Sequence, residues 1–318
     1  NEGGIVAGTP AQANSDIKTD AVIYALGMDI QVTVTLKDTD GNVVTGQKSA
    51  LTTTSVTVPN ATLKSGTDWT DNEDGTYTAM YTSQNASKNN QASLKLNGWT
   101  ESRTSEKYAI MGVVEVKDVT VDGHTFAVDT GFPSRGFLNA RFQLNVDGPK
   151  YYTWRADAGW VSVINGEVRF TGQGTADKVT ITGIPTQGQE NIVKFSFSLK
   201  KWYMVTRVYP RTAEREEVNK RCLDGTGYPA VPLSEFSIHE GYVATQRRQM
   251  GALWNEYGRA TERMPVPDGV EGDRLGYVST AEQPPGAPYF KTYTGQTSNG
   301  AIIYRSGDVR HLCARDLS

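Results

Sequence analysis

Short runs of alternating apolar and polar residues, separated by Asp-Gly or Asn-Gly pairs, occupy the first 200 residues of this chain. Ile30 and Val32 alternate with polar neighbours ahead of the pair at Asp40-Gly41, and a similar run follows Asp74-Gly75. Side chains two residues apart lie on one face of a strand, and an Asp-Gly pair suits a tight hairpin turn. The pattern therefore predicts antiparallel β-sandwiches, with the residues from Ile30 forming a half-buried strand that enters a hairpin.

A new run of alternation begins at Val114, which places a module boundary near residues 111–113. Two all-β sandwiches are therefore expected, a first module at residues 1–112 and a second module at residues 113–200. Few residues separate the two patterns, so we expect a stiff stalk with small interfaces between its modules.

Residues 201–318, called the head below, differ sharply in composition, with 12 Arg and only 3 Lys. Acidic residues at 214, 216 and 217 precede basic residues at 220–221, which matches the helix dipole and predicts a helix that ends near Cys222. Apolar side chains at positions 250, 253, 254 and 257 have helical spacing. They predict a second helix over 246–257, with Gly258 as its C-terminal cap.

Cys222 and Cys313 lie 91 positions apart, near the two ends of the head. They lack the spacing of a redox motif and the ligand count of a zinc site. A structural disulfide is the preferred interpretation, and two buried free thiols are the alternative. Closing a loop of this length stabilises a fold by about 4–5 kcal/mol in the chain-entropy model, and it requires an oxidising compartment.

Three stretches of the chain resemble one known family. VTVTLKDTDGNVVTG (32–46) and DNEDGTYTAMYTS (71–83) are similar to the immunoglobulin-like repeats of the intimin/invasin adhesins, which are inverse autotransporters of bacteria. YTWRADAGWVSVINGEVRFTGQGTADKVTITG (152–183) resembles the second kind of repeat in that family. Two helices, a cysteine ending the first, LWNEYG in the second and a final cysteine in HLCARD resemble the C-type lectin-like head of intimin and invasin.

The resemblance implies immunoglobulin-like domains at 1–112 and 113–200, followed by an α+β C-type lectin-like domain at 201–318 with one disulfide. It also implies the extracellular part of an outer-membrane-anchored protein at the bacterial surface. The head would then bind a host surface or secreted protein, such as a receptor, an integrin or an antibody-like glycoprotein, with the fragment itself monomeric. A homotypic adhesin of aggregation and biofilm is the alternative from another class, and a carbohydrate-binding lectin is a third.

The calcium-dependent lectin alternative meets a departure from its motif. Such lectins use a Glu-Pro-Asn or Gln-Pro-Asp loop, because a hard cation needs several converging oxygens. Here Gln283-Pro284 is followed by Pro285, which supplies no such oxygen. Trp254-Asn255-Glu256 resembles the Trp-Asn-Asp strand of these lectins, but it falls on the second predicted helix, where Trp254 is needed for the core. We therefore expect no metal site, and a protein-binding head is preferred.

Protein interfaces draw much of their binding energy from aromatic and Arg side chains, and long loops often carry such residues. The Pro- and Gly-rich stretch at 264–293 is expected to be a long, stiff loop that presents several of them. For residues 247, 248 and 259 a solvated helix face is the preferred interpretation and a binding surface the alternative, and for residues 289 and 290 the start of buried strands is preferred to binding. The candidate receptor-binding residues are Arg247, Arg248, Arg274, Tyr277, Tyr289, Phe290 and Tyr293.

Other functional classes find little support in the sequence. The formal net charge is −3, so no nucleic-acid partner is expected, and no apolar run approaches the roughly 20 residues that cross a bilayer. None of the three histidines, His124, His239 and His311, lies in a catalytic motif. We expect no enzymatic activity, no catalytic residue, no cofactor and no direct membrane insertion.

Overall fold

The computed structural model describes residues 8–212, 214–240, 243–244, 247–282, 286 and 291–317. Contacts divide the chain into two compact units. The first unit runs to residue 114 and includes 190–192, and the second holds 115–189 and the residues from 193 onward. No helix among the described residues has the length and apolar character needed to span a membrane.

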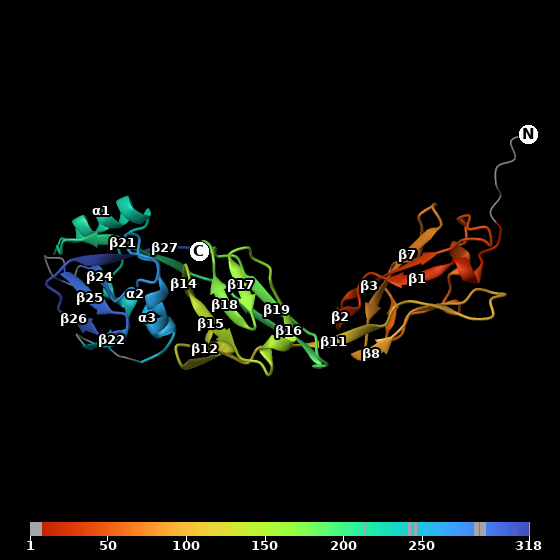
Figure 1. Cartoon of the computed structure of the whole chain (residues 1–318), viewed down its shortest axis with the longest axis horizontal. Coiled ribbons are helices and arrows are strands. Elements are labelled where there is room, and N and C mark those ends of the chain that lie inside the picture. The colour runs from red at the N-terminus through yellow and green to blue at the C-terminus, as the bar shows by residue number, and fades with distance from the viewer. Residues whose placement is uncertain are drawn as a thin grey trace, which may run out of the picture. The chain divides into compact units, whose positions relative to one another are not determined.

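The first unit is built from short strands (Figure 1). Most of its buried apolar side chains form one core. Its largest sheet has the order β1–β3–β7–β5, with β6 also paired to β7. The bounds are β1 (Asp16–Thr19), β3 (Asp29–Thr35), β5 (Ala61–Leu63), β6 (Thr70–Asp71) and β7 (Thr76–Ser83). A second sheet joins β10 (Arg103–Thr104), β9 (Ser93–Leu94) and β4 (Val56–Thr57). In a third, β11 (Tyr108–Glu115) pairs with β2 (Ile23–Ala25) and β8 (Ser87–Asn90).

The strand predicted from Ile30 is β3, whose buried residues alternate as expected. The hairpin predicted after it is present but short: the antiparallel bridge Lys37–Val43 and the backbone hydrogen bonds from Val44 to Leu36 and from Asp38 to Asn42 span the turn, while β3 itself pairs with β1 and β7. The carboxylate of Asp38 accepts hydrogen bonds from the backbone N–H groups of Asp40 and Asn42. These local bonds form a turn around the side chain in place of a continued ladder.

The second module is a two-layer sandwich, as its alternation predicts. One layer has the order β13–β12–β15–β18–β17, and the other contains β16–β19–β20. The bounds of the first layer are β12 (Asp118–Val121), β13 (His124–Ala127), β15 (Arg141–Leu144), β17 (Val161–Ile164) and β18 (Glu167–Phe170). Those of the second are β16 (Tyr152–Ala156), β19 (Val179–Pro185) and β20 (Asn191–Phe197). Ring contacts among Phe142, Phe170 and Phe197 fill the space between the layers.

The head is organised around a mixed sheet in the order β14–β21–β27–β24–β25–β26. Its strands are β14 (Arg135–Phe137), β21 (Lys201–Tyr209), β24 (Tyr277–Glu282), β25 (Lys291–Gln296), β26 (Ile302–Ile303) and β27 (Val309–Asp316). Strand β14 comes from the second module and pairs with β21 in parallel. The smaller elements are α1 (Arg215–Thr226), α2 (Leu233–Phe236), α3 (Leu253–Tyr257), the 3₁₀ helix η5 (Gly258–Arg263), β22 (His239–Glu240) and β23 (Val243–Ala244).

The first predicted helix is α1, which lies beside β21 and β27 (Figure 1). Its Cys222 forms a disulfide with Cys313 of β27, with 5.7 Å between the Cα atoms. The second predicted helix is wrong over 247–252, since α3 begins only at Leu253. Gly251 has φ of 117°, a backbone conformation outside the α-helical region. Gly258 follows α3 at the expected capping position, and the chain then continues as η5.

The long loop predicted over 264–293 is also wrong in part. Residues 277–282 form β24, between β25 and β27, and Tyr293 belongs to β25. Strand β24 is nearly continuously buried, so its backbone groups need partners, and the neighbouring strands supply them. Within this range, the described residues that lie outside the sheet are therefore 264–276 and Gly286.

Candidate functional site

A fully buried carboxylate joins the head to the second module. Glu256 of α3 is 0% exposed. Its Oε1 accepts a hydrogen bond from the backbone N–H of Ser134 at 2.8 Å, and its Oε2 accepts one from the Ser134 hydroxyl at 2.6 Å. Arg135 Nη1 and the N–H of Gly251 also donate to Oε2. Four donors thus converge on one carboxylate, which offsets the cost of burying its charge.

The same contact continues into the head sheet through Arg135. Its Nε donates to the hydroxyl of Tyr203 at 3.0 Å, and that hydroxyl donates to Glu235 Oε2 at 2.8 Å. Lys201 lies 2.7 Å from the other oxygen of Glu235. Burial opposes ionisation of Glu235, but the bonds from Lys201 and Tyr203 outweigh it and lower the pKa of that carboxyl. A connected polar network therefore fixes the head against the second module.

Arg248 makes the second fixed contact between these two parts. Its guanidinium donates to the backbone oxygen of Val121 at 3.0 Å and to that of Asp122 at 3.2 Å, while Nε and Nη2 bind backbone oxygens in α3. Its side chain is only 11% exposed, and burial lowers the pKa of the guanidinium. The structure thus places this candidate residue in the internal contact between module and head.

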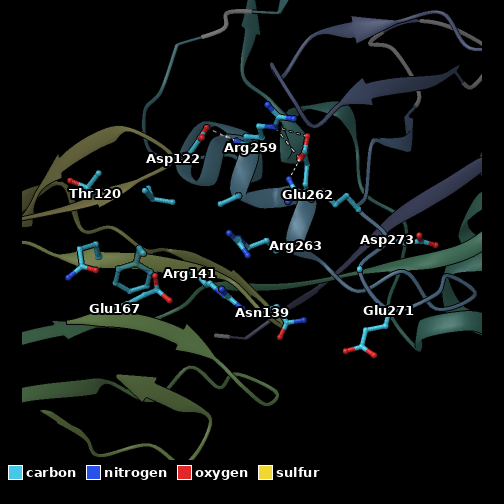
Figure 2. Close-up of a pocket in the computed structure, with 16 residues that line it drawn as sticks. Thr120, Asp122, Asn139, Arg141, Glu167, Arg259, Glu262, Arg263, Glu271 and Asp273 are labelled. Atoms are coloured by element: carbon cyan, nitrogen blue, oxygen red, sulfur yellow. Dashed lines mark hydrogen bonds and ion pairs between the residues drawn. The ribbon is translucent and has the colours of Figure 1, made fainter. Parts of the chain in front are cut away.

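Beside this contact lies a cleft of about 650 Å³ between the second module and the head. Strands β12, β15 and β18 form one wall, and η5 with residues 271–274 forms the other. Figure 2 shows Arg263 in the middle of the cleft, with Arg141 and Asn139 below it in this view. The lining residues are Thr120, Val121, Asp122, Asn139, Arg141, Phe142, Gln143, Glu167, Arg259, Ala260, Glu262, Arg263, Glu271, Gly272, Asp273 and Arg274.

Two of the cleft carboxylates are already engaged within the protein (Figure 2). Asp122 Oδ2 accepts the backbone N–H of Arg259 at 2.7 Å and lies 3.5 Å from Arg248 Nη1. Glu262 pairs with Arg259 at 3.2 Å and, at 3.8 Å, with Arg274. Arg274, a candidate residue from the sequence, is thus 73% exposed at the mouth of this cleft and only loosely held.

A second group of side chains on the head pairs tyrosine with arginine, and we call it the Tyr–Arg patch. Tyr304 and Arg211 are exposed, and Tyr277 and Arg305 are half-buried. Tyr304 is 80% exposed, and the guanidinium carbon of Arg211 lies 4.8 Å from the centre of its ring. Arg305, the next residue, lies 4.4 Å from the ring of Tyr277. Cation–π contacts hold these four side chains in place while leaving the ring of Tyr304 open to solvent.

The structure does not gather the candidate residues at one place. Arg274 lines the cleft, Tyr277 lies in the Tyr–Arg patch and Arg247 is exposed just before α3. Tyr293 is half-buried and packs against the apolar core. Tyr289 and Phe290 lie outside the described residues.

Sequence reasoning missed Arg141, Arg263, Arg211 and Tyr304. Arg141 lies on β15, far from the head in sequence, so only the folded chain brings it to a cleft with Arg263. Tyr304 follows Ile302 and Ile303, a context that favours a buried strand. The one sequence signal that could have indicated this surface is the adjacent pair Tyr304-Arg305, in a head that is rich in Arg and poor in Lys.

Two family profiles match successive parts of the chain. Residues 11–111 match the profile described as invasin, domain 3, and residues 117–197 match the profile described as invasin, domain 4. The two ranges together span more than half of the chain. The chain belongs to the intimin/invasin family of adhesins. As in that family, it is an extracellular part of an outer-membrane-anchored bacterial protein, and its family points to adhesion rather than catalysis.

One curated relative of this intimin/invasin-family chain is the inverse autotransporter adhesin YeeJ of Escherichia coli strain K12. It is 33% identical over 97 residues, which are 30% of this chain and 4% of YeeJ. The chain therefore spans only a small part of that relative's length.

Two solved structures are similar over nearly the whole chain. The crystal structure of invasin, described as a bacterial integrin-binding protein, has 18% identity and a TM-score of 0.49, covering 98% of this chain and 81% of invasin. A C-terminal 282-residue fragment of intimin, in complex with the intimin-binding domain of the translocated intimin receptor, has 13% identity and a TM-score of 0.39. It covers 94% of this chain and 99% of the fragment.

Proposed function

We propose that this chain is the binding end of a bacterial adhesin, and that its head contacts a host protein through the Tyr–Arg patch. The domains of the proposal are an immunoglobulin-like domain at 1–112, a second at 113–200 and a C-type lectin-like domain at 201–318. The short helices, the mixed sheet and the disulfide between its two ends support this description of the head.

The observation that carries the proposal is the exposure of Tyr304, whose ring contacts Arg211 and whose chain neighbour Arg305 contacts Tyr277. Tyr and Arg are enriched among residues whose truncation costs an interface most, and a Tyr ring buries a large area at a modest loss of side-chain freedom. The second module contributes indirectly, since the Glu256 and Arg248 contacts fix the head against it and lower the cost of ordering on binding.

The test measures binding of the whole fluorescently labelled fragment to cultured host epithelial cells. Tyr304→Ala should weaken binding at least tenfold, as truncation of a central aromatic anchor costs about 2 kcal/mol or more. Tyr151→Ala is the matched control, because Tyr151 is also exposed and lies 5.0 Å from the ammonium of Lys150, but in the second module.

Treatment of the cells separates the alternatives. Trypsin should abolish binding, whereas periodate oxidation of glycans and chelation of calcium should leave it intact. Loss of binding in chelator with rescue by calcium would favour a lectin. Aggregation of beads coated with the fragment alone, sensitive to Tyr304→Ala, would favour a homotypic adhesin. Point variants are preferable to removal of residues 201–318, because removal would uncover the buried strand β14.

A further inference from the structure

Two arginines of the cleft differ from their neighbours in having no bonded partner among the described residues. The Nε of Arg141 is buried without any hydrogen-bond acceptor within reach. Arg263 ends η5, is exposed, and forms no ion pair or side-chain hydrogen bond with a described residue. One side chain comes from the second module and the other from the head, and both line the same cleft (Figure 2).

The acidic residues of the cleft do not supply the missing partner. Asp122 and Glu262 are committed to Arg248, Arg259 and Arg274, as described above. Glu271 and Asp273 are exposed residues near the margin of the cleft and lie apart from Arg263 in Figure 2. Glu167 is also exposed and lies near Arg141 on the paired strand β18, but the two form no ion pair. Arg141 and Arg263 thus line the cleft without an ion-pair partner among the described residues, so their positive charges favour an incoming anion.

We propose that the cleft receives the carboxylate of an Asp or Glu side chain from a protein partner, bound by Arg141 and Arg263. Guanidinium groups bind a carboxylate through paired, charge-assisted hydrogen bonds, and a cleft of about 650 Å³ has ample room for such a side chain. The inference rests on the proposed binding of a protein by the adhesin, and it names a second point of contact.

The margins of the cleft argue for a single carboxylate over a polyanion. Glu167, Glu271 and Asp273 would repel the closely spaced charges of a sulfated glycan, while a lone acidic side chain flanked by neutral or basic residues avoids them. Negative charge at the margin therefore acts as a selectivity element against polyanions.

The test uses two blocked pentapeptides that differ only in the central residue, Gly-Gly-Asp-Gly-Gly and Gly-Gly-Asn-Gly-Gly. The whole fragment is titrated with each, and the side-chain Nε–H signals of its arginines are followed by ¹⁵N NMR. The Asp peptide should shift the signals of Arg141 and Arg263 in a saturable manner, and the Asn peptide should leave them in place. A sulfated heparin disaccharide serves as the polyanion probe.

Substitutions of single arginines test which residues bind the Asp peptide. Arg263→Gln and Arg141→Gln should each weaken binding of the Asp peptide about tenfold, the effect of losing one charge-assisted contact. Arg155→Gln, an exposed arginine on β16 of the same module, should leave it unchanged. Because Arg263 makes no internal side-chain bond with a described residue, its variant should fold normally, which the dispersion of the backbone spectrum verifies.

Three results would overturn the proposal: equal shifts with the two peptides, tighter binding of the disaccharide than of the Asp peptide, or no saturable shift at the solubility limit. The peptide titration does not use the host partner and does not involve Tyr304. Failure here would therefore leave the Tyr–Arg patch standing, and failure of the cell-binding test would leave the carboxylate site standing.

Discussion

Glu256 shows how one buried side chain can set the relation between two parts of this protein. Its carboxylate is inaccessible to solvent and accepts from Ser134, Arg135 and Gly251. A buried charge with several donors is tolerated, but removing one member of such a group leaves the others unpaired. Substitution of Glu256 is therefore expected to lower the free energy of unfolding more than substitution of most side chains of its size.

Replacement of Glu256 by Gln tests this argument. The amide keeps the shape of the side chain but loses the charge beside Arg135 and turns one acceptor into a donor facing existing donors. We expect the free energy of unfolding to fall by about 3 kcal/mol, as for a broken buried ion pair. Urea denaturation measures this, with Glu167→Gln, an exposed glutamate on β18, as the control. A loss below about 0.5 kcal/mol, the range of ordinary surface substitutions, would contradict the assigned role.

His311 is a second sensitive residue, buried on β27 close to the disulfide. Its Nε2 lies 3.2 Å from Arg221 Nη1, and its ring stacks on Tyr209. Arginine can only donate, so Nε2 accepts and the imidazole is neutral. Burial, with a smaller contribution from the charge of Arg221, lowers the pKa of His311 from 6.5 to about 4.

This shift has a definite sign for stability. The folded state holds His311 neutral, whereas the unfolded chain protonates it below pH 6.5, so acid favours unfolding. His311 therefore does not reduce the free energy of unfolding above pH 6.5. The free energy of unfolding falls as the pH drops from 6.5 to 4, by about 3 kcal/mol at most. His311→Gln, which keeps an acceptor for Arg221, should flatten the dependence between pH 6.5 and 4. Urea midpoints measured across this range provide the check, and parallel curves for variant and parent would refute it.

At the scale of elements, the disulfide fastens α1 to β27, which lies at the centre of the head sheet. Cys222 and Cys313 are 91 residues apart in sequence. A bridge across so long a loop restricts the unfolded chain strongly, so the stabilisation of the head by it is expected to be about 4–5 kcal/mol. The bond matters because α1 otherwise depends on packing along one face of β21 and β27.

The double variant Cys222→Ser with Cys313→Ser should lower the free energy of unfolding by about that amount, and dithiothreitol should do the same to the parent. The variant itself should be insensitive to dithiothreitol. Urea denaturation gives the energies, and mass spectrometry under non-reducing conditions verifies the bond. Two free thiols in the untreated fragment would remove the basis for the prediction.

The elements that the sequence predicts well are those whose signal is local. Alternation identifies β3, β7 and the strands of the second module, and the charge pattern identifies α1. The start of α3 was misplaced because helical spacing at Met250 does not reveal the φ of Gly251. Strand β24 was missed because its nearly continuous burial hides the two-residue period. The sequence does not predict the cleft, since Arg141 and Arg263 come to line it only through contacts between residues distant in sequence.

At the scale of the whole molecule, the second module and the head share structure to an unusual degree. Strand β14 leaves the sandwich and extends the head sheet beside β21. The ring of Phe137 on that strand lies 4.9 Å from Tyr257 of α3, and both residues belong to one continuous apolar core. Joint burial and the polar network around Glu256 predict that residues 115–189 and 193–317 unfold as one cooperative unit.

Hydrogen exchange with mass spectrometry can follow this unit along the chain. In the parent, amides of β18 and β27 should lose protection at the same urea concentration, because neither part keeps its core without the other. Glu256→Gln should shift both together to lower urea, while β7 of the first unit keeps its own midpoint. The reason is that the substitution weakens contacts shared by the second module and the head, and β7 lies in a separate core. If β27 exchanged before β18 in the parent, the head would unfold independently of the second module. That result would contradict the prediction that the contacts around Glu256 fix the head against the module.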